Sequence, residues 1–201
     1  LQQGQGTATS STNAPARTGG SFLTPSSSSS APTVQSGASC NRQVSGVAME
    51  ALSSALSAIE SGGNYGAVGA TTCDGSGNCG RALGDKQFMS YRSDVRGVIG
   101  AKPGGAGFLQ DLDSGKPITS VQLLQYLDPS DQQQLFGDDF TRLIGIAQTQ
   151  IDPTTGQIFT GDRLIQRLAQ MHFGGAAVPI DSGATDANGQ LSVKSYGETV
   201  M

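Results

Sequence analysis

Apolar residues recur at every third or fourth position between Asn41 and Glu60, which is the pattern of a helix with one buried face. Ser39 or Asn41 is placed to cap its first turn. The sequence Ser61-Gly62-Gly63 then ends it, because glycine adopts the left-handed conformation that closes many helices. The pattern predicts one long amphipathic helix whose buried stripe contains Val44, Val47, Ala48, Ala51, Leu52, Ala55, Leu56 and Ile59.

Helical patterns return only in the second half of the chain. Roughly forty residues after Gly63 are rich in Gly, Asn, Asp and Ser and predict loops or a small hairpin. Helices are then predicted over 119–127, capped by Thr119 or Ser120, and from Pro129 to Ala147, with a candidate break at Gly137. A turn over 152–156, a helix from Leu164 to Gly174 and a short strand or turn over 191–196 follow. The sum is a mainly α domain of the α+β class, with a glycine-rich insert after its first helix.

Residues 1–39 differ in composition from the rest of the chain. They contain one charged residue, Arg17, no Asp or Glu, three prolines and a run of serines from Ser26 to Ser30. Such a segment cannot bury enough apolar surface to offset an ordering cost of roughly 1–2 kcal/mol per residue. We expect a flexible linker over 1–39 and one folded domain over 40–201, with an ordered arm packed on a partner as the alternative for the linker.

Charge and hydropathy argue against two classes of function. The 201 residues contain 12 Lys and Arg against 16 Asp and Glu, a formal charge of −4, which disfavours a basic nucleic-acid-binding face. No stretch approaches the roughly 18–20 apolar residues of a membrane span. The chain begins with Leu1, on a segment typical of a mature chain from which a signal peptide has been removed. We therefore expect a secreted, periplasmic or extracellular protein.

The three cysteines also bear on the expected location of the protein. Cys73 and Cys79 bracket a short polar turn, so in an oxidising compartment they are predicted to form a local disulfide. Cys40 is then left over, to face the core or to bond to a partner chain or lipid. The three cysteines and His172 lack the ligand spacing of structural zinc sites, so no metal site is predicted.

Glu60 is the candidate catalytic residue. It follows Leu56 by one helical turn, which places its carboxylate at the edge of the buried stripe and at the negative end of the helix dipole. Both the dipole and partial burial raise the pKa of a carboxyl group. A carboxylic acid that stays protonated near neutral pH suits general acid catalysis at a glycosidic oxygen. The alternative is a solvent-facing Glu at a frayed helix end.

Four short motifs around and after this residue occur in an order that is found in one enzyme family. The first is Glu60-Ser61-Gly62-Gly63-Asn64-Tyr65 at the helix end, and the second is Gly84-x-x-Gln87-x-Met89. The third is Met171-His172-Phe173-Gly174-Gly175, and the last is Ser192-Val193-x-x-Tyr196. Together, over residues 44–197, they resemble the motifs of lytic transglycosylases and related goose-type-lysozyme-like domains.

The resemblance implies a lysozyme-like fold and a mechanism. Glu60 would protonate the leaving oxygen of the β-1,4 bond between N-acetylmuramic acid and N-acetylglucosamine in peptidoglycan, and would then deprotonate the 6-hydroxyl to close a 1,6-anhydro ring. No cofactor is implied. If two carboxylates act in hydrolysis instead, Asp74 and Asp85 are the candidates for the second. Residues implied to bind substrate are Ser61, Tyr65, Gln87, Met89, His172, Gly174 and Tyr196.

Two departures from the family pattern support an alternative. Lys86 stands where the family usually has an aromatic or long apolar residue, and Phe173 stands where it often has Asn. The alternative is a non-catalytic lysozyme-like domain that binds peptidoglycan or serves as a structural component of an envelope-spanning secretion, conjugation or virion assembly. The expected partners are peptidoglycan glycan strands and, through the linker over 1–39, such an assembly or a partner chain.

Overall fold

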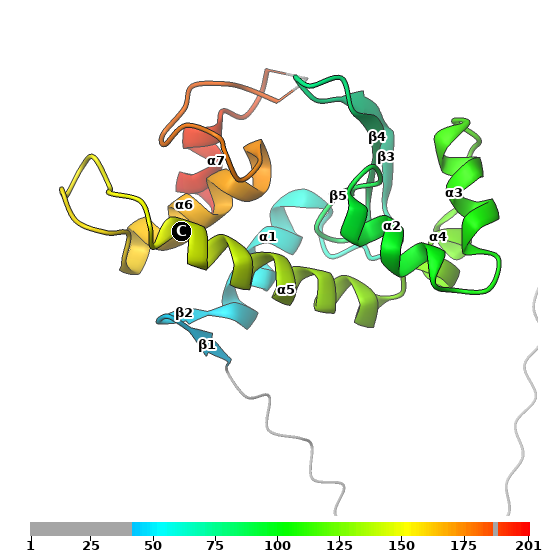
Figure 1. Cartoon of the computed structure of the whole chain (residues 1–201), viewed down its shortest axis with the longest axis horizontal. Helices are drawn as coiled ribbons and strands as arrows, with labels where there is room; N and C mark the ends of the chain where they lie inside the picture. The colour runs from blue at the N-terminus through cyan, green and yellow to red at the C-terminus, as the bar shows by residue number, and fades with distance from the viewer. Residues whose placement is uncertain (1–41, 187–188) are drawn as a thin grey trace, which may run out of the picture. The chain divides into compact units, whose positions relative to one another are not determined.

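The computed structural model describes residues 42–186 and 189–201, so the predicted linker, and the caps Ser39 and Asn41, lie outside the described residues. The described chain is rich in helix and carries two small antiparallel sheets, an α+β composition (Figure 1). The helices are α1 (Met49–Glu60), α2 (Ser93–Gly100), α3 (Gly105–Asp113), α4 (Ser120–Tyr126), α5 (Pro129–Ala147), α6 (Gly161–Gly174) and α7 (Val193–Thr199). The strands are β1 (Gln43–Val44), β2 (Val47–Ala48), β3 (Val68–Cys73), β4 (Cys79–Leu83) and β5 (Phe88–Met89). Among these residues no helix has the length and apolar character that crossing a membrane requires.

The first predicted helix is shorter than expected. Residues 43–48 form the hairpin β1–β2, and α1 begins at Met49, after Ala48, which makes no side-chain cap. The hairpin turns at Ser45 and Gly46, which both have positive φ, at 52° and 81°. Two such residues form the tight turn that matches the twist of paired strands, so the local turn overrides the helical spacing of Val44 and Val47.

The glycine-rich insert contains the predicted hairpin and an unpredicted helix. Strands β3, β4 and β5 pair in chain order, and Cys73 and Cys79 close the first hairpin as a disulfide with Cα atoms 4.0 Å apart. The helix α2 follows, and α3 lies just beyond the insert. In α2 only Val95 and Ile99 are buried, one turn apart, which is too short an apolar stripe to predict a helix.

The later helices largely follow the prediction. The helix α5 has Asp128 as its cap and Pro129 in its first turn, and it continues through Gly137 without a break. The turn after it closes where the amide of Gly156 donates to the carbonyl of Asp152, at 2.8 Å. The segment predicted as a strand or turn over 191–196 instead begins α7, where the hydroxyl of Ser192 accepts from the amide of Ser195, at 3.0 Å.

One continuous core joins these elements, with α5 running along its length. In Figure 1, α5 extends from α4 to α6, while α1 lies between the β3–β4 hairpin on one side and α6 and α7 on the other. The apolar face of α5 inserts Phe136, Phe140 and Leu143 into a cluster that draws buried side chains from every helix. The C-terminal end of α1 is therefore held at the centre of the domain.

Candidate functional site

Glu60 meets Tyr196 at the end of α1. Glu60 is the last residue of α1 and is half-buried, whereas Tyr196, from α7, is 1% exposed. The hydroxyl of Tyr196 donates a hydrogen bond to Oε1 of Glu60. Leu56, one turn earlier, is fully buried and fixes the face on which Glu60 lies. Two residues that are 136 positions apart thus form the centre of the candidate site.

Burial sets the protonation behaviour of this pair. Desolvation raises the pKa of Glu60 above its ordinary value of 4.5, and the hydrogen bond from Tyr196 acts in the opposite direction. Burial and the neighbouring carboxylate also raise the pKa of the Tyr196 hydroxyl, which therefore stays a donor. The raised pKa that the sequence predicted for Glu60 is confirmed, and its main cause is burial.

The turn after α1 connects Glu60 to the loop between β4 and β5. The hydroxyl of Ser61 donates to the backbone carbonyl of Asp85, at 2.9 Å, and accepts from the amide of Asn64, at 3.0 Å. Gly62 and Gly63 both have positive φ, which glycine adopts without steric cost. The hydroxyl of Ser61, predicted to bind substrate, is therefore engaged in holding two backbone segments together.

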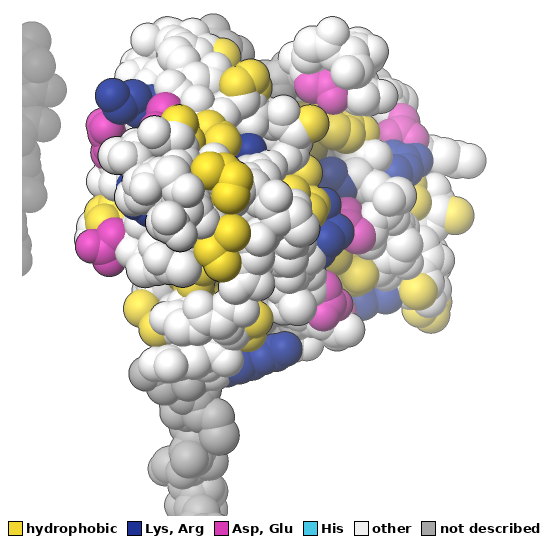
Figure 2. All heavy atoms as spheres, turned by 60° about the vertical axis from the view of Figure 1, so that its left-hand side comes forward, with side chains coloured by type: hydrophobic (Ala, Val, Ile, Leu, Met, Phe, Trp, Pro, Cys, Tyr) yellow, Lys and Arg dark blue, Asp and Glu magenta, His cyan; other side chains and the backbone are white. Residues whose placement is uncertain are grey.

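Figure 2 shows a notch in the surface at its upper edge. In Figure 1, α6 and α7 lie on one side of α1 and the β3–β4 hairpin lies on the other. Hydrogen bonds from the end of α1 reach both parts, through Tyr196 in α7 and through Asp85 after β4. Glu60 therefore lies where the two parts of the domain meet.

The two candidates for a second carboxylate are both committed elsewhere. Asp85 and Lys86 form an ion pair of 2.5 Å, and each side chain is 1% exposed. Asp74 lies in the exposed β3–β4 turn, where its carboxylate accepts from the amides of Ser76 and Asn78, each at 2.9 Å. Hydrogen bonds from Asn78, above all, lower the pKa of Asp74. Neither carboxylate is placed as an exposed partner of Glu60.

Gln87 and Met89 belong to the same β4–β5 region. Gln87 has a φ of +49°, and its side-chain amide donates to the carbonyl of Gly84, at 2.7 Å. Met89 pairs with Ala82 in the sheet and is half-buried. The amide nitrogen of Gln87, predicted to bind sugar, stabilises a tight turn in this structure.

A buried glutamine organises this region, and sequence reasoning missed it. Gln132 is fully buried on α5, and its side-chain amide donates to the carbonyls of Tyr65 and Leu127, each at 2.9 Å. Its Oε1 accepts from the amide of Asp85, at 2.8 Å. A Cβ added at Gly84 would lie 2.0 Å from that oxygen, so Gly84 is required there. The signal was a polar residue one turn before Phe136, on the apolar face of its helix.

Tyr65 faces α5 through both of its oxygen atoms. Its carbonyl accepts from Gln132, and its hydroxyl accepts from the side-chain amide of Gln133, at 2.6 Å. The ring is half-buried. Tyr65, predicted to bind substrate, thus anchors the segment after α1 to α5.

His172 and its neighbours fill the other side of the β4–β5 loop. His172 Nε2 lies 3.1 Å from the carbonyl of Lys86, and its ring packs against Phe88 and Phe140, at centroid distances of 5.7 and 5.4 Å. Desolvation lowers the pKa of His172 to about 4, so the ring is neutral at physiological pH and Nε2 donates to the carbonyl. This arrangement gives His172 a structural role in packing the loop.

Phe173 and Gly174 support the Tyr196 side of the site. The ring of Phe173 stacks on that of Tyr196, at 4.7 Å between centroids. A Cβ added at Gly174 would lie 2.6 Å from a methyl group of Val178, so glycine permits this close packing. Phe173 therefore fixes the orientation of the tyrosine that contacts Glu60.

Comparisons with known proteins leave the site to be interpreted from its own geometry. No family model, no curated protein and no solved structure matches this chain. In residues 42–186 and 189–201, no three His, Cys, Asp or Glu residues gather as metal ligands would. The chemistry that the arrangement supports is therefore that of one half-buried carboxyl group with a raised pKa and a tyrosine hydroxyl on one of its oxygens.

Proposed function

We propose that this protein is a peptidoglycan lytic transglycosylase with a lysozyme-like fold, in which Glu60 acts as acid and then as base. One observation carries the proposal: a carboxyl group at the C-terminal end of a core helix is desolvated, and its pKa is raised. That is the property a general acid needs in order to protonate a glycosidic oxygen near neutral pH. The four motifs that resemble the family support the choice of substrate.

In this proposal the two oxygens of Glu60 have different tasks. Because Oε1 accepts the hydrogen bond from Tyr196, the acidic proton of Glu60 is carried by Oε2. In the proposed reaction Oε2 donates this proton to the leaving oxygen, while the substrate's own acetamido oxygen supports the positive charge at the anomeric carbon. The resulting carboxylate, stabilised by Tyr196, then takes the proton of the 6-hydroxyl as that oxygen closes the 1,6-anhydro ring. One carboxyl group suffices for this sequence, which agrees with the engagement of Asp74 and Asp85 elsewhere.

The proposed location follows from the substrate. Peptidoglycan lies outside the cytoplasmic membrane, and the Cys73–Cys79 disulfide is compatible with an oxidising, extracytoplasmic compartment. We therefore propose an exported protein that acts on glycan strands, with the linker predicted over 1–39 as the route to a partner in an envelope-spanning assembly.

A second candidate function is a non-catalytic domain that binds peptidoglycan or serves a structural role in such an assembly. It is favoured by the internal hydrogen bonds of Ser61, Tyr65 and Gln87, which occupy polar atoms that the resemblance assigns to sugar binding. Lys86 and Phe173, the two departures from the family pattern, give no further support to the non-catalytic function. Lys86 is the partner of Asp85 in a buried ion pair, and Phe173 supports Tyr196.

The two candidates differ in what is released from purified peptidoglycan. We would digest it with the wild-type protein, with Glu60→Gln and with Glu198→Gln, an exposed carboxylate on α7 that serves as the matched control. Mass spectrometry of the soluble fragments should show anhydro-muropeptides from wild type and the control, and none from Glu60→Gln. Fragments with reducing ends would indicate hydrolysis instead. No fragments from any of the three, with binding to peptidoglycan retained, would refute the enzyme and leave the structural role.

A further inference from the structure

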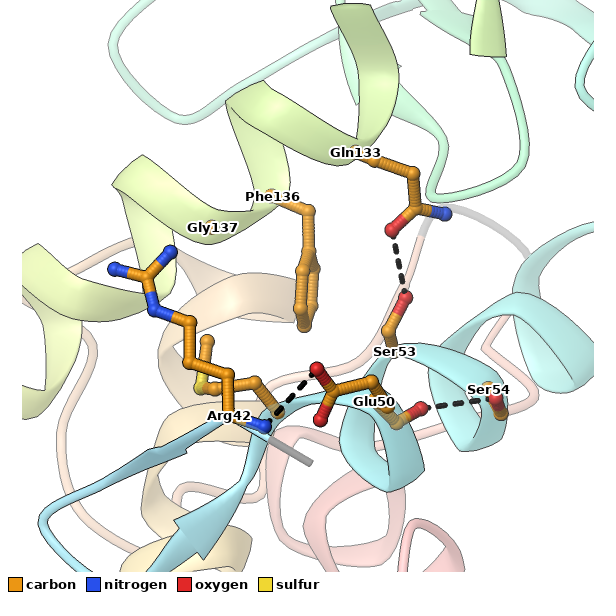
Figure 3. Close-up of a pocket in the computed structure, with 8 residues that line it drawn as sticks. Arg42, Glu50, Ser53, Ser54, Gln133, Phe136 and Gly137 are labelled. Carbon is orange, nitrogen blue, oxygen red and sulfur yellow. Dashed lines mark hydrogen bonds between the residues drawn. The ribbon is translucent and has the colours of Figure 1, made fainter. Parts of the chain in front are cut away.

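A hollow of about 300 Å³ lies between the first half of α1 and α5, at the opposite end of α1 from Glu60 (Figure 3). This volume is at the lower end of the roughly 300–1,000 Å³ of small-molecule sites. Its floor is formed by the buried side chains of Met49 and Phe136. The other residues that line it are Arg42, Glu50, Ser53, Ser54, Gln133 and Gly137.

The uncharged polar side chains of the hollow already make hydrogen bonds within the protein. The hydroxyl of Ser53 donates to Oε1 of Gln133, at 3.2 Å, and closes one side of the hollow (Figure 3). The hydroxyl of Ser54 donates to the backbone carbonyl of Glu50, at 2.9 Å. Recognition of a ligand is therefore left to the two charged side chains.

Arg42 and Glu50 bring opposite charges to the hollow without pairing with each other. Oε1 of Glu50 accepts from the backbone amide of Arg42, at 3.1 Å, while the guanidinium extends toward Gly137 on α5 (Figure 3). Within residues 42–186 and 189–201, no carboxylate forms an ion pair with Arg42. Residues 1–41 and 187–188 contain no Asp or Glu, so they hold no side-chain carboxylate for it. The guanidinium is thus left for an external anion.

We propose that this hollow binds a free amino-acid group on an aliphatic stem. The carboxylate would lie on the guanidinium of Arg42, the ammonium on the carboxylate of Glu50, and the stem on Phe136. Charge-assisted hydrogen bonds of this kind are about twice as strong as neutral ones, which gives the site its specificity. Two sources share the chemistry: a free amino acid, and the distal end of diaminopimelate in the stem peptide of peptidoglycan. The site itself is independent of the proposed function, whereas the stem peptide as its source rests on it.

The test compares two peptides that differ by one charged group. The full chain carrying Glu60→Gln, which separates binding from cleavage, would be titrated calorimetrically with L-alanyl-γ-D-glutamyl-meso-diaminopimelate and with its L-lysine counterpart. The lysine peptide keeps the distal ammonium and lacks the distal carboxylate, so it should bind about tenfold more weakly. Adding Arg42→Gln should abolish this preference, and adding Glu50→Gln should weaken both peptides. Lys194→Gln and Asp138→Asn, exposed charges outside the hollow, are the matched controls and should leave both affinities unchanged.

Three results would overturn the proposal, and a third ligand distinguishes the two sources. Equal affinity for the two peptides, no binding at millimolar concentration, or a preference that survives Arg42→Gln would overturn the proposal. Free meso-diaminopimelate is the third ligand. If it binds as tightly as the diaminopimelate peptide, the amino-acid group alone is sufficient for binding. If the peptide binds more tightly, the stem peptide is the source of the ligand. Glutamine at position 50 keeps an oxygen that accepts from the amide of Arg42, so this variant should fold, and thermal melting checks that it does. The difference in affinity between the two peptides can be measured without any substitution in the hollow. It tests the site even if the digestion experiment shows that the protein releases no sugar fragments.

Discussion

Gln132→Leu should destabilise the domain far more than the same change at its neighbour Gln133. The leucine removes three hydrogen bonds: two that reach fully buried backbone groups, on Asp85 and Leu127, and one to the half-buried carbonyl of Tyr65. Each unsatisfied buried partner costs roughly 1–3 kcal/mol and the third bond about 1 kcal/mol. Burial of leucine offsets about 2 kcal/mol of this sum. The expected net loss in the free energy of unfolding is therefore about 3 kcal/mol.

Gln133 is the matched control because it has the same chemistry on the exposed side of α5. Its side-chain amide bonds to two hydroxyls, that of the half-buried Tyr65 and that of Ser53, which is buried but lines the hollow, and a hydroxyl can rotate to another partner when the amide is removed. Gln133→Leu should cost less than about 1 kcal/mol. Urea unfolding followed by far-ultraviolet circular dichroism measures both changes, and a common slope keeps the comparison valid. If Gln132→Leu fell within about 1 kcal/mol of wild type, or matched Gln133→Leu, the reasoning from buried partners would be refuted.

Three further changes test the site and the hairpin. Glu60→Gln should raise the melting temperature at neutral pH, because burial penalises the charged carboxylate of the wild type. The wild type loses stability as pH rises through the raised pKa of Glu60, so the two proteins should have the same melting temperature below about pH 4.5. A difference in melting temperature that persists below that pH would contradict this cause. Tyr196→Phe removes the hydrogen bond that lowers the pKa of Glu60, so the alkaline limb of the activity profile should move to higher pH; an unmoved limb would argue against Glu60 as the acid. Cys73→Ser should cost about 2 kcal/mol, or roughly 4–8 °C in melting temperature, and a reducing agent should lower the melting temperature of wild type but not of the variant.

The sequence predicted those elements whose local signals agree with their packing. The helix α5 combines a capping residue, a proline in its first turn and a long apolar stripe, so local and tertiary preferences coincide. The helix α7 does not, because it is short and its position depends on close approach to α6: a Cβ at Gly197 would lie 2.9 Å from a backbone carbonyl of α6. No local pattern encodes such an approach. The hairpin over 43–48 was missed for a related reason, since Ser45 adopts a positive φ that its residue type does not suggest.

The site was predictable to the extent that it depends on one helix. The place of Glu60 at the end of an apolar stripe was enough to predict its raised pKa. The contact with Tyr196 and the pairing of Asp85 with Lys86 depend on how distant segments pack, and neither follows from spacing along the chain. Gln132 shows how more could be found: a glutamine on a buried face needs hydrogen-bond partners, and buried backbone carbonyls and amides are the usual ones.

The loop over 84–87 has a consequence for the order in which the protein folds. Its backbone contacts residues that lie 24, 47 and 86 positions away along the chain, in the turn after α1, in α5 and in α6. Contacts of such high sequence separation form late, because each requires the closure of a long stretch of chain. Until these contacts and the one with Tyr196 have formed, Glu60 lacks the burial that raises its pKa. If Glu60 acts as proposed, its acidity should therefore develop only once these distant segments have packed together.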